Sequence, residues 1–106
     1  MLAETKLALG KVKNDYDLEL VGLIQAAVAD LGIVGVKVTG VSFTVNNNVV
    51  TDTSTITDPL LIRAIITYVR LHFKSPEDYD KLERSYNEQK GQLITAAGYG
   101  LPAEVS

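Results

Sequence analysis

Residues 58–79 read DPLLIRAIITYVRLHFKSPEDY, a stretch that contains the start signals of two helices. Asp58 followed by Pro59 is typical of a helix start, because the carboxylate can cap exposed N–H groups and proline suits the first helical position. Apolar residues then cover most directions of a helix expected over residues 59–74, which predicts a central strut buried on most sides. One polar stripe remains on it, made of Arg63, Thr67, Arg70 and Lys74.

A last helix is expected over residues 76–96, because Ser75 can cap it and Pro76 suits its first position. Its apolar stripe, with one polar member, predicts an amphipathic helix at the periphery of the domain. The stripe consists of Tyr79, Leu82, Tyr86, Gln89 and Leu93. Residues 98–106 contain glycine and proline, and we expect them to be extended and loosely held.

Two helices are predicted before the strut, over residues 3–10 and 15–31. Gly10 is placed to end the first, Asn14 or Asp15 can cap the second, and Gly32 is a natural stop for it. The buried face of the second helix follows helical spacing through Leu20, Ile24, Ala27, Val28 and Leu31.

The middle segment, residues 33–57, is rich in β-branched residues and has no helical periodicity. Val41, Phe43 and Val45 alternate with polar residues as in a strand, and Gly40 is expected to break the chain before them. The Asn46-Asn47-Asn48 run is compatible with a hairpin turn or with a mobile tip. The expected fold is mostly α, a small four-helix domain over residues 1–106 whose long middle connection is a candidate β-hairpin arm.

Composition excludes several classes of site. The 106 residues suit one domain, and a net charge of -3 provides no basic field for phosphate. Without cysteine there is no disulfide or thiolate metal site, and one histidine cannot form a multi-histidine metal site. We expect no signal peptide, because residues 1–10 carry Glu4 and Lys6 and lack a continuous apolar stretch before a cleavage site. We expect no membrane span, because the most apolar segment, residues 60–73, is too short and contains two arginines.

No catalytic residue, cofactor site or metal site is expected, so the protein is predicted not to be an enzyme. His72 has no evident orienting partner, and a histidine near a helix end is more often packed than catalytic. Asp78 and Asp80 lie at a helix start, where acids complement exposed N–H groups and are usually solvated.

The tight connection near residue 75 also allows an alternative interpretation, in which the last two helices form a helix-turn-helix motif and the protein is a small DNA-binding regulator. Its recognition helix would carry five acids and three bases over residues 77–90, which disfavours contact with phosphate. Two interpretations of Arg63, Arg70 and Lys74 have equal weight: they bind acids of a partner, or their charged ends lie in solvent.

Six short segments keep a recognisable order along the chain: DYDLEL (15–20), LIQAA (23–27), DLGI (30–33), DPLLIRAIITYV (58–69), SPEDY (75–79) and SYNEQK (85–90). Together they resemble the small head-tail connector proteins of long-tailed bacteriophages and prophages. The resemblance spans most of the chain except the middle segment, and it rests on apolar and capping patterns.

This resemblance implies a structural virion protein without a cofactor. Members of the family form a ring of identical subunits beneath the portal, extend the DNA channel and provide a seat for the stopper or tail-completion protein. The implied location is the head-tail interface of the virion, reached from the bacterial cytoplasm during assembly, with only nonspecific passage of DNA. Val41, Phe43 and Val45 would then form the apolar side of an arm that reaches an adjacent subunit or the portal.

Overall fold

The computed structural model describes residues 1–10, 13–73 and 78–96, and within them four α-helices flank one β-hairpin. This arrangement confirms the predicted fold class, a mostly α domain with a hairpin in its middle connection. The elements are α1 (Leu2–Ala8), a short 3-10 helix η1 (Asn14–Tyr16), α2 (Asp17–Ile33), β1 (Phe43–Asn46), β2 (Val49–Asp52), α3 (Pro59–His72) and α4 (Tyr79–Ala96).

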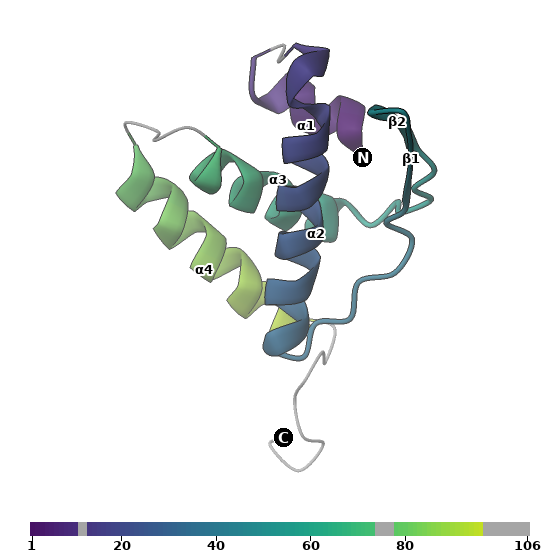
Figure 1. The fold of residues 1–106 in the computed structure, drawn as a ribbon. Helices are drawn as coiled ribbons and strands as arrows, with labels where there is room; N and C mark the ends of the chain where they lie inside the picture. Colours follow the sequence, from purple (N-terminus) through teal and green to yellow (C-terminus); the bar gives the residue numbers. More distant parts are fainter. Residues whose placement is uncertain (11–12, 74–77, 97–106) are drawn as a thin grey trace.

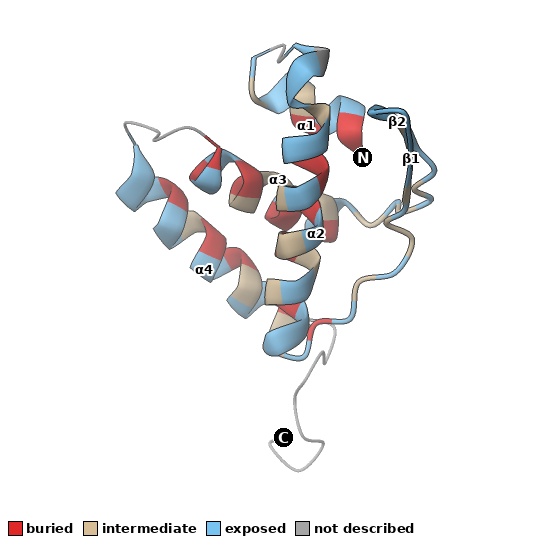
Figure 2. Ribbon diagram, in the orientation of Figure 1, coloured by how far each residue is buried: buried red, intermediate tan, exposed pale blue. Residues whose placement is uncertain are grey.

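Helix α3 is the central strut of the domain. It packs against α1, α2 and α4, and its buried residues face these three neighbours (Figures 1 and 2). The Asp58 side chain caps it by accepting a 3.0 Å hydrogen bond from the Leu60 N–H, as the sequence predicts. The largest fully buried side chains of the core are Thr5, Leu20, Ile24, Leu31, Val36, Ile65 and Val69.

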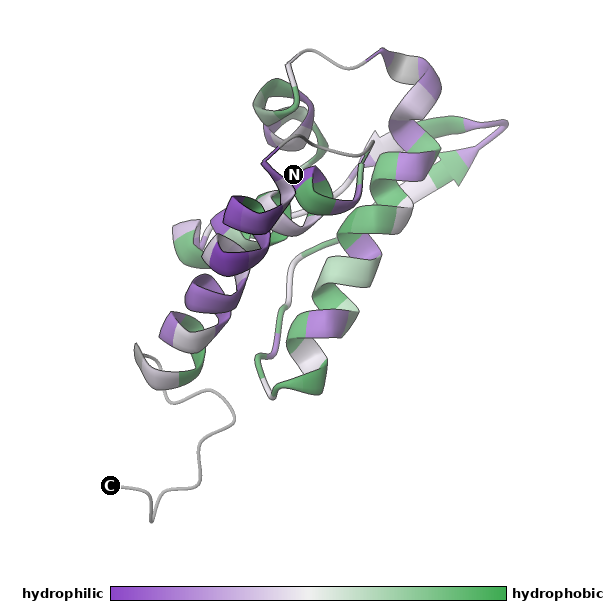
Figure 3. Cartoon of the chain, turned by 90° about the vertical axis from the view of Figure 1, so that its left-hand side faces the viewer, coloured by the Kyte–Doolittle hydropathy of each residue, from purple (hydrophilic) through white to green (hydrophobic). Residues whose placement is uncertain are grey.

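The hairpin and α4 lie on opposite sides of α2 (Figure 1). Strands β1 and β2 pair antiparallel, with Val45 opposite Val50. The two residues between them, Asn47 and Asn48, have φ angles of 51° and 65°, which suits the tight turn favoured in two-residue hairpins. The asparagine run is therefore a hairpin turn. Hydrophilic residues dominate α4, whereas α2 is largely hydrophobic (Figure 3).

Both ends of α2 differ from the sequence prediction. Asn14 and Asp15 belong to η1, and the residue before α2 is Tyr16, which makes no side-chain cap bond. The predicted stop at Gly32 is wrong, since the helix passes through it to Ile33.

The end of α2 is fixed at Gly35 instead. Its φ of 87° lets the Gly35 N–H reach the Gly32 carbonyl at 3.0 Å, while the Val36 N–H reaches the Leu31 carbonyl at 2.9 Å. This pair of bonds is the Schellman motif, and the fully buried Val36 supplies its apolar contact.

Other boundaries and one buried face also differ from the prediction. Helix α1 ends at Ala8 and α3 ends at His72, each two residues before the predicted end. Tyr79 was predicted to be buried, but it begins α4 with 41% of its surface exposed. Residues 74–77 and 98–106, which include the predicted start of the last helix and the tail, lie outside the described residues.

Candidate functional site

The hairpin arm is closed at its base by Gly40. The Gly40 carbonyl accepts hydrogen bonds from the Thr55 N–H at 2.7 Å and the Ile56 N–H at 3.0 Å. Gly40 has a φ of 85°, so the predicted break in the chain is a bend that favours glycine. Next to it, the Ser54 hydroxyl donates to the Ser42 carbonyl at 3.0 Å. These contacts hold the two legs of the arm together.

The base of the arm is also tied to α1 through Asp52. Its Oδ2 accepts a 2.6 Å bond from the Met1 α-amino group and a 2.7 Å bond from the Leu2 N–H, while Oδ1 accepts from the Ser54 N–H at 3.0 Å. Burial by itself would raise the pKa of Asp52, but these donors outweigh it and hold the pKa well below its usual range. The arm base is therefore a charged anchor between segments about fifty positions apart.

The Met1 α-amino group is held by two acids. Burial would lower its pKa, but hydrogen bonds to Asp52 and Glu4 outweigh that effect, so its pKa lies above the ordinary value. The Glu4 contact measures 3.0 Å. Sequence reasoning missed this anchor, because nothing in the local pattern around Asp52 indicates a partner near residue 1.

The predicted apolar side of the arm divides into a covered part and an uncovered part. Val41 and Phe43 are half-buried and pack against the domain's own core, as does Val50. Val45, on the same face, leaves 50% of its surface exposed, and Val49, on the opposite face of the hairpin, leaves 65%. We call residues 45–49 the hairpin tip. The tip carries apolar surface that no described part of the chain covers.

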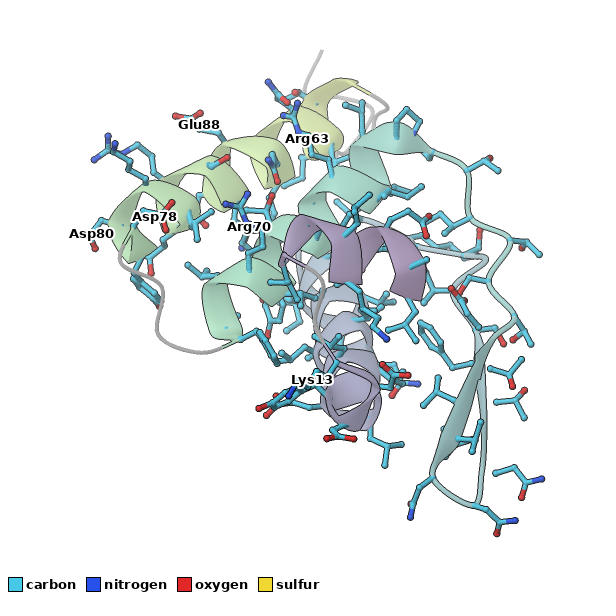
Figure 4. The ribbon with its side chains drawn as sticks, turned by 90° about the horizontal axis from the view of Figure 1, so that it is seen from above. Lys13, Arg63, Arg70, Asp78, Asp80 and Glu88 are labelled. Atoms are coloured by element: carbon cyan, nitrogen blue, oxygen red, sulfur yellow. The ribbon has the colours of Figure 1, made fainter. Side chains whose placement is uncertain are left out.

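Only part of the polar stripe predicted on α3 is exposed to solvent. Arg63 and Arg70 are exposed and face the same side as α4 (Figure 4). Thr67, between them, is buried, and its hydroxyl donates to the Arg63 carbonyl at 2.9 Å, so it belongs to the helix packing. Lys74 lies outside the described residues.

Helix α4 is joined to α2 by a polar cluster that sequence reasoning also missed. The Tyr86 hydroxyl donates to Asp30 Oδ2 at 2.6 Å, and Lys90 Nζ reaches the same oxygen at 3.4 Å. The Lys90 ammonium lies 4.8 Å from the centre of the Tyr86 ring. Burial raises the pKa of Tyr86, and the bond to Asp30 raises it further. Helical spacing had indicated only that Tyr86 faces inward.

The titratable residues singled out in the sequence, His72, Asp78 and Asp80, all lie at the surface. His72 is exposed, and its ring contacts the Tyr68 ring with the centroids 4.3 Å apart and the planes tilted by 45°. Asp78 and Asp80 are exposed at the start of α4 (Figure 4). In the described ranges, no three His, Cys, Asp or Glu residues gather where they could hold a metal ion. The absence of catalytic, cofactor and metal residues stays a prediction.

The exposed face of α4 is acidic, which argues against its entry into a DNA groove. A shallow, open depression with a volume of about 550 Å³ is lined by Asp80, Glu83, Arg84, Asn87 and Glu88. Three acids against one base would repel phosphate. Among the described helices, none has the length and apolar character needed to cross a membrane.

Comparison with known proteins identifies a family. The family model described as "Phage connector protein" matches residues 1–100. No curated protein and no solved structure matches the chain. The match covers the hairpin arm, its anchor at Asp52 and all four described helices. This chain therefore belongs to the phage connector protein family.

Proposed function

We propose that this phage connector protein forms a ring of identical copies beneath the portal of the packaged capsid. The ring extends the DNA channel and provides the seat for the stopper or tail-completion protein. Its place is the head-tail interface of the virion, after synthesis in the bacterial cytoplasm. The family match over residues 1–100 supports a structural connector, and the family is structural and not enzymatic.

The observation that carries the proposal is the construction of the arm. Its base is fixed by Gly40 and Asp52, whereas Val45 and Val49 at the tip are 50% and 65% exposed. Burying such side chains against another surface contributes about 25 cal/mol per Å² of apolar area. An arm fixed at one end and uncovered at the other is suited to contact with a neighbouring copy.

The position of the arm also suits a ring. A ring requires two different surfaces on each copy, because a contact between identical patches closes as a dimer. The hairpin and α4 lie on opposite sides of the domain (Figures 1 and 4). One copy can therefore meet one neighbour through its hairpin side and another through its α4 side.

The test is the native mass of the protein by light scattering over a concentration series, with and without the purified portal protein. The wild-type chain should form a ring-sized species, by itself or on the portal. The double variant Val45→Asp, Val49→Asp should lose this association and keep its helix content, because both side chains lie outside the core. Phe43→Asp is unsuitable, since Phe43 packs on the subunit's own core.

The matched control is Leu60→Asp, which also places an acid at an exposed apolar position, 43% exposed, far from the tip in sequence. Asp in the first turn of a helix is favourable, so α3 should keep its stability. The control should assemble like the wild type. A tip variant that assembled normally would overturn the role of the arm. Salt-sensitive binding of duplex DNA by a monomer that ignores the portal would overturn the proposed function itself.

A further inference from the structure

Two arginines on α3 form a cationic pair that has no acidic partner among the described residues of its own subunit. Arg63 and Arg70 are seven residues apart, so they occupy one face of the helix about 10.5 Å apart along its axis. Arg63 donates to Gln92 Oε1 at 3.5 Å, a long contact to a neutral group. Over residues 1–10, 13–73 and 78–96, no carboxylate lies within ion-pair distance of either guanidinium.

The exposure of Arg63 and Arg70 is not by itself evidence that they bind a partner, because a surface arginine can lie in water at little cost. Evidence for a partner would be a surface of opposite charge whose acids have a matching spacing. Guanidinium groups bind carboxylates through two parallel hydrogen bonds, so arginine is favoured over lysine where such contacts form.

The chain itself carries that matching surface on the outer face of α4. Asp80, Glu83 and Glu88 are exposed there (Figure 4 labels Asp80 and Glu88), and no described cation lies within ion-pair distance of them. Arg84 shares this face, which leaves it with an excess of acids. Asp80 and Glu88 are eight residues apart, or about 12 Å along the helix. That spacing matches the arginine pair within the reach of a long side chain.

We propose that Arg63 and Arg70 of one copy bind Asp80 and Glu88 on α4 of a second copy. This inference rests on the proposed function, because it assigns one of the contacts by which copies associate. The contact joins two different patches, so it can run head-to-tail, with each copy binding one neighbour through its arginines and another through its acids, until a ring closes. Both surfaces lie outside the subunit's core, so forming the contact requires no change within the domain.

The strength of this contact should depend on salt. Single exposed ion pairs contribute only about 0.2–1 kcal/mol, and salt screens them over about 10 Å at moderate ionic strength. Two ion pairs formed together mainly determine the orientation of the two copies and the choice of partner, and they add little to the affinity. Association should therefore weaken as salt rises, whereas contacts of the apolar hairpin tip should not.

The experiment is sedimentation velocity on the full chain over a concentration series, at low and at high salt, with charge-exchanged variants. The first variant is Arg63→Glu with Arg70→Glu, and the second is Asp80→Arg with Glu88→Arg. The third carries all four changes and keeps the wild-type net charge. The control for the first variant is Lys13→Glu with Lys37→Glu, an equal change of charge at other exposed positions.

At low salt, the first and second variants should each need about tenfold more protein to associate than the wild type. The four-fold exchange should restore association, and so should an equal mixture of the first two variants, because each then meets an opposite charge. The lysine control should behave as the wild type. Circular dichroism of every variant checks that the fold is kept.

The outcomes separate this inference from the proposed function. If the wild type associates but the arginine variant associates equally well, the inference is wrong while the proposed function stands. Loss in both double variants without rescue by exchange or mixing also overturns the inference. A wild type that stays monomeric both by itself and with the portal overturns the proposed function as well. If the arginine variant loses binding to duplex DNA while its self-association is unchanged, Arg63 and Arg70 bind phosphate and the inference is wrong.

Discussion

The Tyr86 hydroxyl donates a 2.6 Å hydrogen bond to Asp30 Oδ2, and this bond joins α4 to α2. Tyr86 is 4% exposed, so its ring fills space in the core while its hydroxyl reaches a partly exposed carboxylate. Helix α4 is otherwise held mainly by α3. The orientation of the peripheral helix thus depends on one polar contact as well as on apolar packing.

Removing that hydroxyl should lower stability. Tyr86→Phe keeps the ring but leaves Asp30 with the longer Lys90 contact, so the free energy of unfolding should fall by about 1 kcal/mol at neutral pH. Urea denaturation followed by circular dichroism measures it. Tyr79→Phe, at an exposed position, serves as the control and should change stability by less than about 0.5 kcal/mol.

The same tyrosine should make stability sensitive to alkali. The pKa of Tyr86 is raised by burial and by Asp30 above its ordinary value of 10.0, so the folded chain holds the phenolic proton to higher pH than the unfolded chain does. The free energy of unfolding should therefore fall as pH rises above about 10. Tyr86→Phe should make this fall shallower, with a remainder from Tyr68, whose pKa burial also raises. An unchanged slope would contradict the assignment.

The arm base should be sensitive to acid. Asp52 accepts bonds from Met1, Leu2 and Ser54, which hold its pKa below the ordinary value of 3.8. Its stabilising effect is complete above that pH and is lost as pH falls below it. Asp52→Asn should cost about 1–2 kcal/mol at neutral pH, and the difference from wild type should shrink below pH 3.8.

Denaturation at neutral and acid pH measures this effect, with Asp15→Asn as the control. Asp15 is exposed, so its replacement should change stability by less than about 0.5 kcal/mol. An Asp52 variant as stable as the wild type at neutral pH would show that the anchor contributes nothing.

Gly40 should not tolerate a side chain. A Cβ there would lie 3.0 Å from the Ile56 backbone N and 3.1 Å from Thr55 Oγ1, and its φ of 85° is unfavourable for other residues. Gly40→Ala should therefore destabilise the domain by about 1–2 kcal/mol. Gly22→Ala is the opposite case, because nothing lies within 4 Å and the residue is inside α2, so stability should rise by about 0.5–1 kcal/mol. Thermal melts of both variants provide the comparison.

Replacing the buried amide of Gln89 by an apolar group should raise the stability of the domain. Gln89 is 7% exposed, and no described group donates to its Oε1, while its Nε2 makes only a 3.3 Å contact with Ser85 Oγ. Gln89→Met keeps the length and removes the unpaired polar atom, so the free energy of unfolding should increase by about 1 kcal/mol. Gln25→Met, at an exposed position of α2, should have almost no effect. A loss of stability in Gln89→Met would mean that a water satisfies Oε1.

Local patterns correctly predicted much of the fold. Asp58 and Pro59 start α3 where expected, because capping and proline geometry act between neighbours in sequence. The asparagine run turns the hairpin, since asparagine tolerates positive φ. The error at Gly32 arose because a glycine inside a helix costs only about 1 kcal/mol, while the buried Val36 favours a later stop.

The order of the helices and the family follow from the sequence, since they depend on capping, periodicity and segment order, whereas the asparagine run left a hairpin turn and a mobile tip both open. The inward packing of Phe43, with Val45 half-exposed, depends on tertiary contacts, although both side chains lie on one side of the hairpin. The tertiary structure also decided that Asp52 binds Leu2 and that Asp30 binds Tyr86. These pairs are 50 and 56 residues apart, and their contacts depend on how packed helices bring distant segments together, which no local pattern encodes.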